Sequence, residues 1–108
     1  DLDGAMALVN QVRKRVTLPD VVPATSKDDA IDKILNERFL ELAFEGQRWF
    51  DLKREGKTIA VLSKQTYTKA GVEIPIPYVN NLTEKDLLWP VPQSVLDNNP
   101  NLSQNPDY

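Results

Sequence analysis

The sequence of 108 residues contains neither cysteine nor histidine. Without these side chains the chain can form no disulfide, thiol nucleophile or Ser-His-Asp triad, and no thiolate or imidazole metal site. We therefore expect neither a metal nor another cofactor. Long hydrophobic runs are missing as well, because none approaches the ~20 apolar residues that a helix needs to span a bilayer.

Charge of one sign is not concentrated anywhere. The 13 Lys and Arg residues are mixed among 16 Asp and Glu residues, which gives a net charge of -3. Such a balance offers no basic patch for a phosphate backbone, so we expect no nucleic-acid partner. The length is that of one small domain. Since the first residues enter helical periodicity almost directly and lack an initiator methionine, we expect the chain to be a segment of a longer protein.

Apolar residues near the start recur at steps of three and four, which predicts an amphipathic helix with one buried stripe. The stripe consists of Leu2, Ala5, Met6, Val9, Val12 and Val16. Pro19 and Pro23 cannot continue this helix and predict a loop that extends to about Ser26.

A second, long helix is predicted for residues 27–55. Thr25 or Ser26 can cap its start, because Asp28 and Asp29 follow where negative charge suits a helix N-terminus. Gly56 is a suitable residue to end it.

One apolar seam runs along this long helix at helical spacing. The seam contains Ile31, Leu35, Leu42 and Trp49, with Leu52 at its edge. Gly46 falls near the same seam, and a glycine inside a helix costs about 1 kcal/mol relative to alanine. We therefore expect a neighbouring element to approach the helix closely at Gly46.

The last part of the chain is predicted to be less regular. Residues 58–65 favour a short helix, residues 66–81 favour extended pieces around an Ala70-Gly71 turn, and Thr83 or Asn81 can cap a single turn near residues 84–86. The tail, residues 93–108, is rich in turns. The predicted fold class is therefore mostly α, with two amphipathic helices, the second one long, and an irregular C-terminal tail.

The charged residues of the long helix have the spacing of intrahelical ion pairs. Arg38 and Glu41 are three residues apart, as are Glu45 and Arg48. Glu37 and Glu41 carry like charges four residues apart, so we expect a cation from Arg38 or from another element to reach them. On an apolar seam such groups must be fully hydrogen-bonded, and their expected role is to fix the helix against a neighbour.

A catalytic interpretation competes with this one. Two carboxylates such as Glu41 and Glu45 can form the acid and base of a glycosidase. Each of them, however, has an arginine three residues away, which favours its charged form, whereas a general acid needs the opposite shift. We therefore expect a structural role, no enzymatic activity and no catalytic residue.

The aromatic residues suggest a further alternative, because sugar rings stack on Trp and Tyr side chains. Trp49 lies on the apolar seam and is expected in the core, and Trp89 is expected to anchor the tail to the helices. Tyr67 and Tyr78 lie in the irregular region and are candidates for exposure and ligand contact. Tyr108 closes the sequence.

Two motifs in this order resemble the C-terminal part of the SusD/RagB family, the outer-membrane nutrient-binding lipoproteins of the Bacteroidetes. The stretch ILNERFLELAFEGQRWFDLKREGK is similar to a family helix of the pattern ER-x-x-EL-x-x-EG-x-R-x-x-DL-x-R-x-G. The matching residues are Glu37, Arg38, Glu41, Leu42, Glu45, Gly46, Arg48, Asp51, Leu52, Arg54 and Gly56.

The second motif, LLWPVPQSVLDNNPNLSQNPDY, is similar to an L-x-P-I-P segment followed by an NP-x-L-x-QNPGY ending. The matching residues are Pro90, Val91, Pro92, Asn99, Pro100, Leu102, Gln104, Asn105, Pro106 and Tyr108. The opening helix is similar to a family pattern A-x-x-x-N-x-x-R-x-R-A at Ala7, Asn10, Arg13 and Arg15. Asp107 stands where the family often has glycine, the residue that adopts positive φ most readily.

The resemblance implies that residues 1–108 are the C-terminal segment of a SusD-like domain, a larger α-helical fold with tetratricopeptide-like helix pairs. It implies a non-catalytic lipoprotein at the outer-membrane surface, with an anchor outside this segment. Such a protein binds an oligosaccharide or another nutrient and delivers it to a SusC-like TonB-dependent transporter. The implied partners are the ligand, the transporter and the rest of the parent chain.

The family's ligand-contacting aromatics usually lie outside this segment, so the resemblance assigns no binding residue here. The rival function from another class is a helical protein–protein interaction module without sugar binding.

Overall fold

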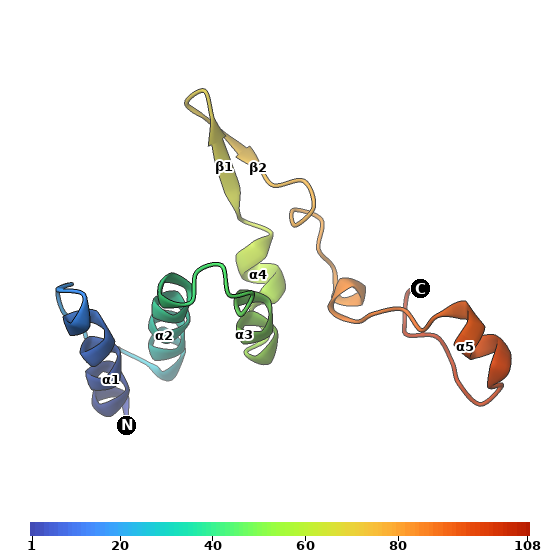
Figure 1. Cartoon of the computed structure of the whole chain (residues 1–108), viewed down its shortest axis with the longest axis horizontal. Coiled ribbons are helices and arrows are strands. Elements are labelled where there is room, and N and C mark those ends of the chain that lie inside the picture. Colours follow the sequence, from blue (N-terminus) through green and yellow to red (C-terminus); the bar gives the residue numbers. More distant parts are fainter. The chain divides into compact units, whose positions relative to one another are not determined.

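The computed structural model describes all 108 residues, and most of its regular structure is helical (Figure 1). This confirms the predicted fold class. The helices are α1 (Leu2–Arg15), α2 (Lys27–Glu41), α3 (Arg48–Arg54), α4 (Thr58–Leu62), the 3-10 helix η1 (Glu84–Leu87) and α5 (Gln93–Asn98). Two short strands, β1 (Thr66–Lys69) and β2 (Val72–Pro75), form one small sheet. The chain divides into two compact units, Asp1–Leu52 and Lys53–Tyr108, which are described in turn.

The first unit is built on the side-by-side helices α1 and α2 (Figure 1). The predicted apolar stripe of α1 is buried at its centre, where Met6 and Val9 pack against Ala30 of α2. The partly buried side chains around this cluster are Leu2, Ala5, Val21, Ala24 and Ile34. The first predicted helix is therefore confirmed, with its buried face at Met6 and Val9, whereas Val16, predicted as part of the buried stripe, follows the helix and is 50% exposed.

The loop between α1 and α2 is held by side chains of α1. The Oδ1 atom of Asn10 accepts a hydrogen bond from the Val21 backbone N–H at 2.8 Å, and Arg13 Nε donates to the Pro19 carbonyl at 2.7 Å. Ser26 caps α2 as predicted, because its hydroxyl accepts from the Asp29 backbone N–H at 3.1 Å. These contacts fix where α2 starts relative to α1.

The prediction of one long helix over residues 27–55 is wrong. Helix α2 ends at Glu41, α3 begins at Arg48, and a turn of residues 42–47 separates them. Within this turn Phe44 has φ 68° and Gly46 has φ 73°, a left-handed conformation that a right-handed helix cannot contain.

The predicted reason for Gly46 is wrong as well. A Cβ atom placed on Gly46 would meet no heavy atom within 4 Å, so no neighbouring element approaches it closely. The glycine instead serves the positive φ of the turn. The predicted apolar seam keeps its burial across the break, since Leu35 and Leu52 are buried and Leu42 and Trp49 are partly buried.

The second unit contains the β-hairpin. Strand β1 pairs with β2 in antiparallel register, with Thr66 opposite Pro75 and Lys69 opposite Val72. Ala70 (φ 51°) and Gly71 (φ 81°) form the two-residue turn, and positive φ at both positions matches the twist of the flanking strands. The predicted extended pieces around an Ala-Gly turn are therefore confirmed for residues 66–75, whereas residues 77–81, predicted as extended too, form turns.

The short helical elements of the second unit follow local capping signals. Asp86 Oδ2 accepts hydrogen bonds from the backbone N–H and the hydroxyl of Thr83, both at 2.8 Å, and this confirms Thr83 as the residue that begins η1. Helix α5 adds one short helix to the tail, which the sequence predicted only to be rich in turns. No helix of the chain combines the length and the apolar character needed to cross a membrane.

Candidate functional site

The two like-charged residues of α2 are reached by cations from α1. Arg13 Nη1 donates to Glu37 Oε2 at 2.7 Å, and the side chains of both residues are largely buried. Arg15 forms an ion pair with Glu41 at a more exposed position. The prediction that another element supplies the cation is confirmed, and the opposed charges hold α1 and α2 together along one edge.

A bidentate ion pair joins α2 to α3. Arg38 donates from Nε to Asp51 Oδ2 at 2.8 Å and from Nη2 to Asp51 Oδ1 at 3.0 Å. These hydrogen bonds to the Asp51 carboxylate raise the pKa of Arg38 above its ordinary value. The predicted pairing of Arg38 with Glu41 is therefore wrong, because the turn at residues 42–47 brings Asp51 to Arg38 instead.

Arg48 provides a second link between α3 and α2. Its Nη1 atom donates to the Leu35 carbonyl at 2.9 Å, and its guanidinium lies 4.8 Å from the centre of the Phe39 ring. The expected ion pair between Arg48 and Glu45 is replaced by these contacts, since Glu45 belongs to the turn. Arg38 and Arg48, the arginines of the ER and EG-x-R motifs, therefore both connect α2 to α3.

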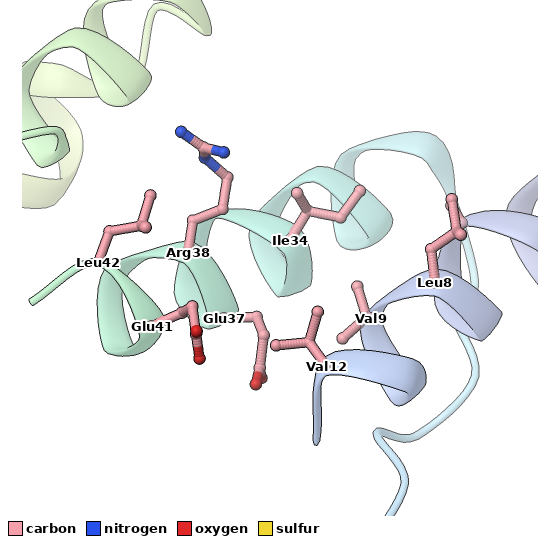
Figure 2. A pocket seen from close by; sticks show the side chains of 9 residues that line it. Leu8, Val9, Val12, Ile34, Glu37, Arg38, Glu41 and Leu42 are labelled. Atoms are coloured by element: carbon pink, nitrogen blue, oxygen red, sulfur yellow. The ribbon is translucent and has the colours of Figure 1, made fainter. Parts of the chain in front are cut away.

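An apolar groove of about 370 Å³ lies between α1 and α2 (Figure 2). Its lining residues are Ala5, Leu8, Val9, Val12, Ile34, Glu37, Arg38, Glu41 and Leu42. Figure 2 shows Val9 and Val12 projecting from α1 beside Ile34 and Glu37 of α2. The two carboxylates at this groove are already engaged by the arginines of α1.

The carboxylates of the glycosidase alternative belong to different elements. Glu41 is the last residue of α2, lines the groove between α1 and α2 and forms an ion pair with Arg15. Glu45 lies in the turn of residues 42–47. Glu41 therefore has a structural partner in α1.

The aromatic candidates differ strongly in exposure. Tyr78 is 92% exposed and Trp89 is 89% exposed, whereas Tyr67 and Tyr108 are each about half exposed. The expected exposure of Tyr67 and Tyr78 is confirmed. The expected role of Trp89 as an anchor is wrong, because its side chain is left almost entirely in solvent. Trp49 is partly buried, in line with its place on the seam.

The polar residues of the tail are used to bind the segment that precedes α5. Gln104 Oε1 accepts from the Val91 N–H at 2.7 Å, and Gln104 Nε2 donates to the Val91 carbonyl at 2.9 Å. Asn105 Nδ2 donates to the Trp89 carbonyl at 2.5 Å, and the Tyr108 hydroxyl lies 2.9 Å from the Leu88 carbonyl. We call Gln104, Asn105 and Tyr108 the tail clamp.

Two further features support the tail clamp. Lys85 Nζ lies 5.4 Å from the centre of the Tyr108 ring, and the Tyr108 hydroxyl also lies 3.1 Å from the Lys85 carbonyl. Asp107 has φ 67°, so the position where the family often has glycine does adopt the left-handed conformation here. The sequence matched Gln104, Asn105 and Tyr108 to a family motif but gave no signal for which backbone groups they bind.

Most motif residues described above thus connect elements of a helical protein, and the exposed aromatics remain available for contacts. The contacts define a mostly helical chain whose motif residues join its elements. The chain belongs to the SusD family, whose family model matches residues 1–108.

Two curated relatives come from Formosa agariphila. The chain is 38% identical to SusD-like protein P38 and 32% identical to SusD-like protein P2, in each case over 96% of this chain. The matched region covers 20% of the first relative and 21% of the second, so the chain spans about a fifth of their length. No solved structure gives a significant match to the chain.

Proposed function

We propose that the protein binds an oligosaccharide or a related nutrient at the bacterial cell surface and does not transform it. The observation that carries this proposal is the match to the SusD family over all 108 residues. Proteins of this family are in general surface lipoproteins of the outer membrane that bind nutrients. The ion pair of Glu41 with Arg15 supports a structural role for this carboxylate over the glycosidase alternative.

The finer parts of the proposal follow from the family. Residues 1–108 form the C-terminal segment of a SusD-like domain, and the protein is a lipid-anchored component of the outer-membrane surface. It passes its ligand to a SusC-like TonB-dependent transporter. The contacts that join α1, α2 and α3 support a scaffold role for this segment within such a protein.

The test is affinity electrophoresis of the native protein, as its cell makes it, beside the isolated 108-residue chain. The gels contain amylopectin, xylan, glucomannan or pectin. We expect one polysaccharide to retard the native protein and bovine serum albumin to migrate unchanged. Retardation of both samples would place a binding site within residues 1–108. If none of these glycans slows either sample, the sugar assignment fails and a peptide ligand becomes the better hypothesis.

A protein–protein interaction module is the second candidate function, and the apolar groove between α1 and α2 favours it. Leu8, which lines this groove, is 65% exposed. This alternative requires capture of a protein partner by the chain without affinity for sugar. A Leu8→Asp variant would then lose the partner, whereas under the glycan-binding proposal it would retain its retardation in the gel.

A further inference from the structure

The apolar surface of α1 is wider than its contact with α2. Counted at about 100° per residue, the apolar positions from Met6 through Val9 to Leu8 span roughly 160° of the circumference of α1. Met6 and Val9 are buried against Ala30 of α2, whereas Leu8, at the other edge of this span, is 65% exposed. A helix that contacts a single neighbour needs only a narrow apolar seam. The pattern of α1 is therefore that of a helix with two neighbours, of which α2 is one.

The second apolar face of α1 borders the groove between α1 and α2 (Figure 2). Leu8 and Val12 line this groove from α1 and are four residues apart, and Ile34 and Leu42 line it from α2 and are eight residues apart. Residues at these spacings share one face of a helix. The lining side chains therefore form one row on each helix, and a groove between two such rows accepts the apolar ridge of a third helix.

The charged side chains that line the groove are paired within the chain. Glu37 and Glu41 are bound by two arginines of α1, and Arg38 is bound by Asp51 of α3. Contacts that form and dissociate use charges to steer the partner, whereas permanent contacts are more apolar. A groove with apolar walls and paired charges therefore favours an occupant that stays in place.

We propose that the groove holds an amphipathic helix of the same polypeptide, from a part of the native protein outside residues 1–108. The chain spans about a fifth of the length of its two curated relatives, so most of a protein of that length lies outside this segment. A segment of the same polypeptide has a high effective concentration, whereas a second copy or another protein must be recruited from solution. The apolar residues of the occupant are expected to recur at steps of three and four, as a ridge between two helices requires.

The first experiment identifies the occupant in the native protein without a substitution. The protein is produced with photo-leucine, whose diazirine group forms a cross-link to whatever lies against it, and is irradiated in dilute solution. Mass spectrometry of the digested protein identifies the partner peptide, and fragmentation distinguishes cross-links of Leu8 from those of Leu2. We expect Leu8 to be linked to a peptide of the same polypeptide from outside residues 1–108, in protein that keeps the mass of the monomer.

A second experiment measures whether Leu8 is covered in the native protein. Leu8→Asp is expected to lower its melting temperature by several degrees, because the occupant would bury a carboxylate, while the protein stays folded at room temperature. Leu8→Met is the matched control, since it keeps an apolar side chain of similar volume, and it is expected to melt close to the wild type. Substitutions on an open surface change stability little. Equal melting temperatures of both variants would therefore show an open groove and overturn the proposal.

Three other cross-linking results would also overturn it. A covalent dimer would show that a second copy fills the groove, and a link to a different protein would show a docking site for a partner. Cross-links of Leu8 confined to residues 1–108 would show that no further helix lies there. None of these results bears on glycan binding, which the electrophoresis tests separately.

Discussion

At the scale of single residues, the turn between α2 and α3 places two different side chains in the same backbone conformation. Phe44 (φ 68°) and Gly46 (φ 73°) are both left-handed, and Phe44 is fully exposed. A residue with a Cβ atom loses roughly 1–2 kcal/mol in this region relative to glycine. The strain of the turn is therefore concentrated at Phe44.

Opposite substitutions in this turn should have opposite effects. Phe44→Gly is expected to raise the free energy of unfolding by about 0.5–1 kcal/mol, because the relief of strain exceeds the added flexibility of the unfolded chain. Gly46→Ala is expected to lower it by about 1 kcal/mol, although an added Cβ meets no neighbour. Urea denaturation of both variants measures the changes. A loss of stability in Phe44→Gly would show that the phenylalanine packs against something.

Asp29 gives a prediction for acidic pH. Its carboxylate accepts hydrogen bonds from Lys33 Nζ at 2.5 Å and from the Thr25 N–H at 2.8 Å, and these two contacts, that of Lys33 first, lower the pKa of Asp29. A carboxyl whose pKa is lowered by folding stabilises the fold above its unfolded pKa of about 4, and this contribution is lost as the pH falls through the folded value. Helicity should therefore decrease below about pH 4.

The measurement is the circular dichroism of helices between about pH 6 and about pH 2. In Asp29→Asn the decrease attributable to this carboxyl should be missing, so the acid transition should become shallower. An identical transition in the variant would show that the start of α2 does not depend on the charge of Asp29.

At the scale of elements, the two ion pairs between α1 and α2 differ in burial. The Arg13 and Glu37 side chains are 17% and 11% exposed, whereas those of Arg15 and Glu41 are 63% and 35% exposed. Removing one partner of a buried pair leaves an uncompensated charge, while exposed pairs contribute little. Because Glu37 is buried, we expect the pair of Arg13 and Glu37 to contribute more to the stability of the contact between α1 and α2 than the pair of Arg15 and Glu41.

We expect Glu37→Gln to lower the free energy of unfolding by about 2 kcal/mol and Glu41→Gln by less than about 1 kcal/mol. Thermal unfolding at low and at high salt measures both, and only the effect of Glu41→Gln should shrink with salt. Glu41→Gln also tests the glycosidase alternative, because a folded variant that has lost a measurable turnover of the wild type would support it. Equal losses of stability in the two variants would contradict the expectation that the more buried ion pair contributes more.

At the scale of the whole molecule, the apolar core is thin. Only five apolar residues are buried: Met6, Val9, Ala30, Leu35 and Leu52. Many large apolar side chains remain exposed, and the chain divides into two units. Small domains with little buried surface are marginally stable and depend on further contacts.

The isolated 108-residue chain is therefore expected to unfold over a broad temperature range and to depend on other protein for stability. Calorimetry at several concentrations, together with sedimentation, tests this. An apparent melting temperature that rises with concentration would show that copies of the chain cover one another. A monomer with a sharp melt, independent of concentration, would count against the prediction.

Local signals in the sequence predicted much of this fold. The caps at Ser26 and Thr83 and the Ala70-Gly71 turn depend on side chains within a few residues, so pattern and residue type sufficed. The division of the long helix was missed because Leu42 and Trp49 continue one apolar periodicity through both helices. Nothing in the sequence indicates that Phe44 takes a left-handed conformation, or that Arg38 and Arg48 link α2 to α3 across this turn.

For the candidate site too, the sequence did not reveal which distant residues come into contact. The like charges of Glu37 and Glu41 predicted that a cation would come from elsewhere, but spacing alone does not say that Arg13 and Arg15 supply it. Trp89 was expected in a buried contact because its neighbours are apolar. Its carbonyl is bound by Asn105, 16 positions later, and no local pattern encodes that contact.

The contact of Gln104 with Val91 has a consequence for the alignment of the tail. The carboxamide of Gln104 pairs with both the N–H and the C=O of one residue, as a peptide group of a neighbouring strand would. The residues on either side of Val91 are Pro90 and Pro92, which have no N–H to donate. A slip of one residue in either direction would therefore remove one of the two donors of Gln104 Oε1, the N–H of Val91, and leave only the N–H of Asn105, so the pairing favours one register of the tail. The connection between these two residues consequently tolerates an insertion or a deletion only where the added or lost length can be absorbed outside this pairing.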